Sequence, residues 1–98
     1  MLNKFETIDI LRSFKKSFSE KYGIISIGIF GSVARNQSTE KSDIDICIKT
    51  VSPNPFVLIK IKEELESLFH RKVDIVRIRE TMNSALKKRI EKEGIYVW

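Results

Sequence analysis

The sequence is poor in the residues that cross-link or interrupt a fold: it has one cysteine, one histidine, two prolines and four glycines among 98 residues. A single cysteine excludes a disulfide framework within the chain and favours a reducing compartment, the cytoplasm. Cys47 stands inside an apolar run, so we expect a small buried side chain there. No apolar stretch approaches the roughly 20 residues of a membrane span. Glu6 and Asp9 interrupt the N-terminal segment, which argues against a secretory leader.

The length and the net charge of the chain limit the classes of protein to which it can belong. Ninety-eight residues are enough for one compact core, so we expect a single domain over 1–98 without a separate substrate-binding domain. Hydrophobic residues at 42% and charged residues at 32% exclude a disordered chain. The net charge of +5 favours anionic partners such as nucleotides or acidic protein surfaces, although solvated lysine-rich helix faces explain it equally well. We do not expect direct binding of nucleic acid.

The hydrophobic periodicity predicts helices and strands in alternation. Apolar residues three and four apart predict amphipathic helices, and short β-branched runs predict strands. The expected helices cover residues 3–22, a short segment from 31 that Ser32 caps, 55–70 and 80–94; the expected strands cover 24–30, 43–49, 72–78 and 95–98, with a polar turn at 38–42. This order predicts an α/β fold, in detail an α+β two-layer domain with a mixed sheet of about four strands and helices on one face.

Two aspartates share one face of the strand at 43–49. Ile44, Ile46 and Ile48 alternate with Asp43, Asp45 and Cys47, so the two carboxylates point the same way, with Cβ atoms about 7 Å apart. Alone they repel each other, which a divalent cation would relieve, and Mg²⁺ takes one or two carboxylates together with waters and phosphates. Asp74, in the next apolar strand, supplies a third acid. If the strands are neighbours, the three acids form a cluster able to hold two metal ions.

A candidate phosphate cradle precedes these acids. Gly31 allows close approach of the backbone to a ligand, and Ser32 adds a hydroxyl at the start of a short helix. A cradle ten residues before a metal clamp is what phosphoryl-type transfer requires, since its catalysis is mostly positioning and charge stabilisation. Arg35 is predicted to contact either the triphosphate or an acid of its own helix. Ser42 lies close enough to touch nucleotide, and a solvated loop position is the alternative.

The stretch "GSVARNQSTEKSDIDICI" resembles the Gly-Ser and Asp-x-Asp signature of the DNA polymerase β-like nucleotidyltransferase superfamily, and in particular its minimal nucleotidyltransferase (MNT) group. The resemblance covers nearly the whole chain and implies a polymerase β palm-like fold. By motif match it implies nucleotide contacts at Gly31 and Ser32 and metal binding at Asp43, Asp45 and Asp74. Asn36 stands where many members carry glycine, which should alter only the turn.

The resemblance also implies the activity and the partner. MNT proteins commonly pair with HEPN-domain proteins as the antitoxin of a toxin–antitoxin system, and some transfer AMP from ATP to the partner. We therefore expect an Mg²⁺-dependent nucleotidyltransferase, with two ions and ATP as substrate. Two alternatives stay open: a non-catalytic antitoxin that acts by binding alone, and adenylylation of a small molecule such as an aminoglycoside. The small size and an open sheet face also favour association of the chain with itself or with a partner.

Overall fold

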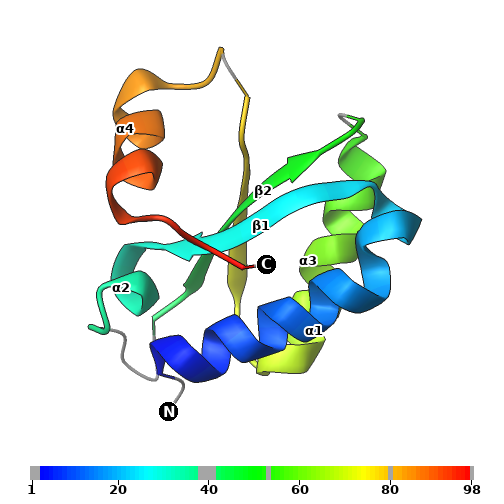
Figure 1. Ribbon diagram of the computed structural model, residues 1–98, viewed down its shortest axis with the longest axis horizontal. Coiled ribbons are helices and arrows are strands. Elements are labelled where there is room, and N and C mark those ends of the chain that lie inside the picture. The colour runs from blue at the N-terminus through cyan, green and yellow to red at the C-terminus, as the bar shows by residue number, and fades with distance from the viewer. Residues whose placement is uncertain (1–2, 38–41, 53, 80, 98) are drawn as a thin grey trace.

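The computed structural model describes residues 3–37, 42–52, 54–79 and 81–97 (Figure 1). The elements follow one another as α1 (Lys4–Tyr22), β1 (Ile24–Phe30), α2 (Gly31–Ala34), β2 (Ile44–Thr50), α3 (Pro55–Phe69), β3 (Val73–Arg77), α4 (Ser84–Glu93) and β4 (Ile95–Tyr96). Every predicted element is present. The main shift of a boundary is at α4, which begins at Ser84 rather than at 80, because the side chain of Asn83 caps the backbone N–H of Leu86. Residues 38–41 of the predicted turn, residue 80 and Trp98 lie outside the described ranges.

The ends of the long helices follow their sequence signals. The side chain of Asn3 accepts a hydrogen bond from the backbone N–H of Glu6 at 2.8 Å and opens α1, and Gly23 closes the helix with φ at 63°. Asn54 caps α3 in the same way, through the N–H of Phe56 at 2.9 Å, and His70 ends it in the left-handed region. These local signals place α1 and α3 before tertiary packing is considered.

The four strands form one mixed sheet in the order β3-β2-β1-β4. β1 runs antiparallel to both of its neighbours, β2 and β4, whereas β2 and β3 are parallel because α3 crosses over between them. In this register Asp45 of β2 pairs with Phe30 on one side and with Asp74 on the other. The carboxyl end of β1 and the amino ends of β2 and β3 therefore meet at one edge of the sheet.

The larger core lies between the sheet and the helices α1 and α3. Ile44, Ile46 and Ile48 of β2 are fully buried there, as the period-two pattern predicts. Leu11 and Phe14 contribute from α1, and Ile61 and Leu65 from α3.

The prediction that the helices cover only one face of the sheet is wrong for α4. Ile90 of α4 packs with Phe30 and Cys47, and these three form a second buried cluster, separate from the larger core. Figure 1 shows α4 on the side of the sheet away from α1 and α3. Partly buried Met82 and Leu86 pack against it. An amphipathic helix needs an apolar surface, and Cys47 and Phe30 supply one on the face that carries the aspartates. That face is thus covered at Cys47 and open at Asp45, which is only half-buried.

None of the helices in the described ranges is long and apolar enough to cross a bilayer.

Shortening a buried side chain of the central strand β2 should lower the stability of the fold. Ile46 is 0% exposed in the middle of the sheet, so Ile46→Ala should lower the free energy of unfolding by about 3 kcal/mol, through lost burial and the cavity left behind. Urea denaturation followed by circular dichroism measures this loss. Lys49→Ala, at an exposed position of the same strand, is the control and should change stability by less than about 0.5 kcal/mol. Equal losses in the two variants would contradict the assigned core.

Candidate functional site

The backbone of Gly31 lies directly against the carboxylate of Asp45. An ideal Cβ built on Gly31 would stand 2.2 Å from Oδ2 of Asp45, and the φ angle of Gly31 is 72°. The left-handed φ favours glycine, and an added Cβ would force the side chain of Asp45 to shift. The sequence feature that suggested a phosphate cradle is therefore tied to the first acid-bearing strand by direct contact.

Ser32 does not cap α2 as predicted. The N-cap position belongs to Phe30, which offers no side-chain acceptor, and Gly31 already has a place in the helix. Ser32 is half-buried within this short helix, and its backbone carbonyl accepts a hydrogen bond from the N–H of Gln37 at 2.8 Å. Its hydroxyl is thus not used as a helix cap and stands one residue from the Gly31–Asp45 contact.

The turn after α2 explains the departure at Asn36. The residue has a φ of 59° and its N–H donates to the carbonyl of Val33 at 3.0 Å. Asparagine tolerates the left-handed region better than most residues, and glycine adopts it freely. Asn36 therefore fits this turn, and the expectation that the departure from glycine alters only the turn stays a prediction.

Three carboxylates influence one another at the edge of the sheet. Burial raises the pKa of Asp45 above its ordinary value of 3.8, and the negative charges of Asp74 and Asp43 raise it further. Asp74 is the register partner of Asp45, and Asp43 immediately precedes β2; both are exposed. Arg89 and Arg35 partly offset this effect on the pKa by their positive charges. The site thus concentrates negative charge on neighbouring strands, at a position where deprotonated Asp45 is disfavoured.

The acidic residues fit a hard cation but do not form a closed centre. In residues 3–37, 42–52, 54–79 and 81–97, no three Asp, Glu, His or Cys side chains converge closely enough to enclose a metal ion. Mg²⁺ does not need such a cage, since it is usually bound through one or two carboxylates and completes its shell with waters and phosphates. The mutual repulsion that raises the pKa of Asp45 is the condition that a bound cation relieves. Asp43 and Asp45 therefore fit Mg²⁺ that arrives with a nucleotide.

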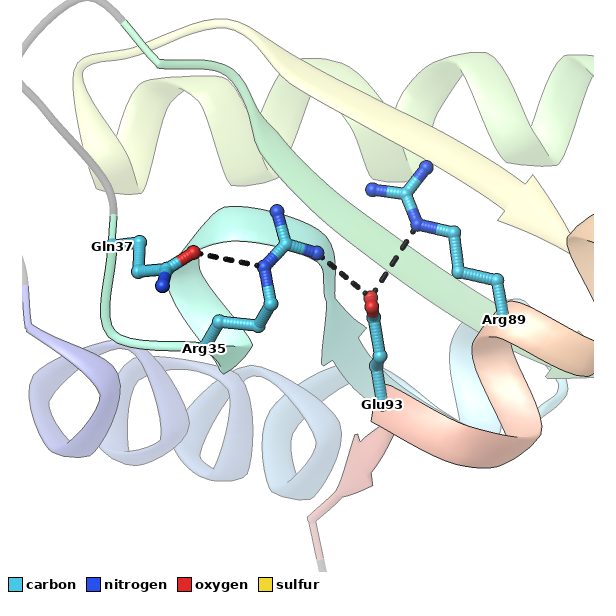
Figure 2. A network of polar contacts seen from close by, with 4 residues as sticks. All are labelled: Arg35, Gln37, Arg89 and Glu93. Atoms are coloured by element: carbon cyan, nitrogen blue, oxygen red, sulfur yellow. Dashed lines mark hydrogen bonds and ion pairs between the residues drawn. The ribbon is translucent and has the colours of Figure 1, made fainter.

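Arg35 is held by an acid of α4 rather than by an acid of its own helix. Its Nη1 lies 3.0 Å from Oε2 of Glu93, and its Nε donates to Oε1 of Gln37 at 3.1 Å (Figure 2). Nε of Arg89 lies 3.4 Å from the same oxygen of Glu93. Partial burial alone would raise the pKa of Glu93, but the charges and hydrogen bonds of Arg35 and Arg89 lower it overall. The residue is thus held as a carboxylate between two cations.

Glu93 and Arg89 are the residues that sequence reasoning missed. Their spacing of four is a recognisable signal of a helical ion pair, but such pairs are common on solvated faces. Nothing in the sequence showed that α4 would cover the face that carries Asp45.

Ser42 lies just before the aspartates. Its backbone carbonyl accepts a hydrogen bond from Nη2 of Arg71, which follows α3, and the residue is half-buried. This contact ties the approach to β2 to the end of α3. A nucleotide contact by Ser42 stays a prediction.

Cys47 is buried in the cluster beneath α4 and is not a nucleophile. Burial raises the pKa of its thiol to about 11, although a hydrogen bond with Tyr96 opposes the shift. A thiolate is the reactive form of cysteine, so this side chain acts as a small hydrophobe, as predicted.

Known proteins resemble this chain over nearly its whole length. The nucleotidyltransferase domain family matches residues 11–97. A provisionally named protein adenylyltransferase of Methanocaldococcus jannaschii is 45% identical over 93 residues, which are 94% of this chain and 95% of that protein. The protein adenylyltransferase MntA of Thermococcus cleftensis is 35% identical over 98 residues, with 99% of this chain and 98% of that protein covered.

Solved structures share the fold. A provisionally assigned minimal nucleotidyltransferase superposes with a TM-score of 0.77 at 27% identity, over 96% of this chain and 95% of that one. A Shewanella oneidensis complex of an MNT antitoxin with a tri-AMPylated HEPN toxin gives a TM-score of 0.66 at 18% identity, over 93% of this chain and 71% of that one. The second likeness shows the fold alone.

Replacing Gly31 should cost more stability than its left-handed φ alone explains. Gly23 has a similar φ of 63°, but a Cβ there would meet Val51 at an ordinary 3.5 Å. Each alanine variant carries about 1–2 kcal/mol of backbone strain, and Gly31→Ala adds about 1–3 kcal/mol of overlap with Asp45. Chemical denaturation of Gly31→Ala, Gly23→Ala and Gly31→Ala/Asp45→Ala measures the difference, which Asp45→Ala should largely remove. An equal cost for the two glycine variants would rule out the contact with Asp45.

The raised pKa of Asp45 has a defined effect on stability. The folded state holds the proton of this carboxyl more tightly than the unfolded chain, so the contribution of Asp45 to stability is fully present below pH 3.8 and is lost as the pH rises through the folded-state pKa. In EDTA at pH 7, Asp45→Asn should therefore melt at a higher temperature than wild type, and this advantage should shrink toward pH 3.8. Thermal melts across pH measure it, with the exposed Glu20→Gln as control. Lower stability of Asp45→Asn at pH 7 would contradict the assignment.

Proposed function

Because this chain belongs to the nucleotidyltransferase domain family, we propose that it transfers AMP from ATP to a hydroxyl group of a partner protein. The chain is an enzyme of the nucleotidyltransferase class, and the proposal concerns its nucleotide, metal and acceptor. The relatives over almost the whole length of the chain carry the name protein adenylyltransferase, which supports AMP as the group transferred and a protein as the acceptor.

The contact between Gly31 and Asp45 is the observation that carries the proposal. It joins Gly31, proposed for phosphate binding, with the strand that bears Asp45, proposed for metal binding. The sheet register then adds Asp74 beside Asp45. Phosphate, cation and acceptor hydroxyl would thus be bound within neighbouring residues of three strands, and such positioning supplies most of the catalysis in this type of transfer.

The proposed roles follow from these positions. Asp43 and Asp45 hold Mg²⁺, and Asp74 contributes to a second ion. The bound cation would supply charge stabilisation for the phosphoryl oxygens. Gly31 and Ser32 contact the phosphates, the first through its backbone and the second through its hydroxyl. Contacts of Arg35 and Ser42 with the nucleotide complete the proposed set.

The reaction is a displacement at the α-phosphorus. The oxygen of the acceptor hydroxyl forms a bond to that phosphorus, and the bond from the phosphorus to the oxygen that bridges to the β-phosphate breaks. Pyrophosphate leaves with the electron pair of that bond. Asp74, whose carboxylate is exposed at the edge strand, accepts the proton of the hydroxyl.

We place the acceptor on a HEPN-domain protein and the activity in the cytoplasm. The MNT antitoxin of Shewanella oneidensis, which shares the fold, was solved with an AMPylated HEPN toxin, and this supports an antitoxin role for the present chain. Cys47, the one cysteine of the sequence, is free and buried, which agrees with a reducing compartment.

Labelled nucleotide tests the activity directly. The full chain is incubated with α-labelled ATP, Mg²⁺ and the product of its adjacent gene, and label should appear on that protein if it is the HEPN-domain acceptor. Asp45→Asn and Asp43→Asn should each reduce the initial rate by at least about 100-fold, by loss of charge stabilisation, while Glu20→Gln should keep the wild-type rate. Transfer that persists in Asp45→Asn would overturn the assigned site.

The melting temperature with Mg-ATP separates an enzyme from a module that only binds its partner. Saturating Mg-ATP should stabilise wild type by about 2–3 kcal/mol at 100 times its dissociation constant, and Asp45→Asn should lose this gain. An unchanged melting temperature of wild type, together with neutralisation of the HEPN protein without label, favours the non-catalytic antitoxin. Label on an aminoglycoside instead of the protein favours the small-molecule enzyme.

A further inference from the structure

Two arginines from different elements meet over a single carboxylate oxygen. Arg35 ends α2 and Arg89 lies in α4, and both guanidinium groups approach Oε2 of Glu93, at 3.0 Å and 3.4 Å (Figure 2). One carboxylate cannot neutralise two guanidinium groups. The cluster Arg35–Glu93–Arg89 therefore carries one surplus positive charge.

The two arginines keep donors for a further anion. The Arg35 and Arg89 side chains are 40% and 47% exposed, whereas Glu93 is only 22% exposed. Within the described part of the chain, Arg89 donates a hydrogen bond through Nε alone, so both of its terminal nitrogens can donate elsewhere. Guanidinium groups with free N–H donors are well suited to phosphate oxygens, which they bind in pairs.

The cluster stands beside the position proposed for the phosphates. The guanidinium of Arg89 lies over the ring of Phe30 at 5.6 Å from its centroid. Phe30 directly precedes Gly31 and pairs with Asp45 in the sheet. From the other side, the backbone N–H of Arg35 donates to the carbonyl of Gly31 at 3.1 Å. The guanidinium of Arg89 is thus in contact with the residue that precedes Gly31, and Arg35 ends the short helix that Gly31 begins.

We propose that Arg89, positioned by Glu93, contacts the β- and γ-phosphates of the nucleotide and stabilises pyrophosphate as it leaves. The inference rests on the proposed nucleotide site at Gly31 and Asp45. Negative charge grows on pyrophosphate as its bond to the α-phosphorus breaks. Cations beside the β- and γ-phosphates stabilise this charge and so favour the departure of pyrophosphate. Glu93 holds the guanidinium of Arg89 by an ion pair at 3.4 Å, in a position from which its positive charge also acts on the carboxylate of Asp45.

Calorimetry on the full chain tests the role of Arg89 with three ligands: Mg-ATP, Mg-pyrophosphate and AMP. Arg89→Ala should lower the affinity for Mg-ATP and for Mg-pyrophosphate by about tenfold or more, because a charge-assisted hydrogen bond is lost. AMP, which lacks the two outer phosphates, should stay within about twofold of wild type, within ordinary variation for a distant change. Arg12→Ala is the matched control, because Arg12 is also an exposed helical arginine paired with an acid, Asp9 at 3.4 Å; it should bind all three ligands as wild type does.

Glu93→Gln tests the positioning role. This variant should lower the affinity for Mg-ATP by about threefold to tenfold, which is less than the effect of Arg89→Ala. The guanidinium of Arg89 remains, but Glu93 no longer fixes its position. The ratio of ATP to AMP affinity is the decisive readout, since a merely structural role of Glu93 would reduce both affinities together. Arg89→Lys, which keeps the charge without the paired donors, should fall between wild type and Arg89→Ala.

Each outcome decides between the proposals. Arg89→Ala with wild-type affinity for Mg-ATP, or with equal losses for Mg-ATP and AMP, overturns the role of Arg89 while the proposed nucleotide site stands. Wild type that binds neither Mg-ATP nor Mg-pyrophosphate overturns the nucleotide site and this inference with it. If Arg89→Ala does not fold, Arg89→Gln, which retains the aliphatic stem over Phe30, is judged by the same ligands.

Discussion

The close approach of Gly31 to the Asp45 carboxylate is the constraint on which the site depends. β1 and β2 are antiparallel, so the end of β1 and the start of β2 meet at one edge of the sheet, and the register sets Phe30 opposite Asp45. The chain then turns into α2 at Gly31, which has a φ of 72°. An added Cβ at this glycine would overlap Oδ2 of Asp45. A backbone without a side chain and a half-buried carboxylate are thus held together by the strands beneath them.

The same arrangement sets function against stability. Burial raises the pKa of Asp45, and the negative charges of Asp74 and Asp43 raise it further, which means that its deprotonated form opposes folding. Such a cost is typical of functional sites, where charges are held in place for a ligand rather than for the fold. The larger core on the other face, with Ile44, Ile46 and Ile48 fully buried, provides the stability that offsets it.

Periodicity and end signals were sufficient to predict the elements of the fold, because the apolar residues of α1, β1 and β2 follow simple spacings and Asn3 and Gly23 mark the ends of α1. The pairing of Asp45 with Asp74 was predicted only as a condition, that the two strands are neighbours, and the register confirms it. The cap at Ser32 was wrong because Gly31 already belongs to the helix. Local rules could not show that the preceding residue, Phe30, would take the cap position.

The placement of α4 could not be predicted from local patterns, and it changes the chemistry of the open face. Its apolar residue Ile90 packs on Cys47 and Phe30, and the same helix brings Arg89 and Glu93 beside Asp45. The helix α4 therefore serves two purposes: one side completes the smaller core, and the other adds Arg89 to a site whose strands contribute Asp45 and Asp74.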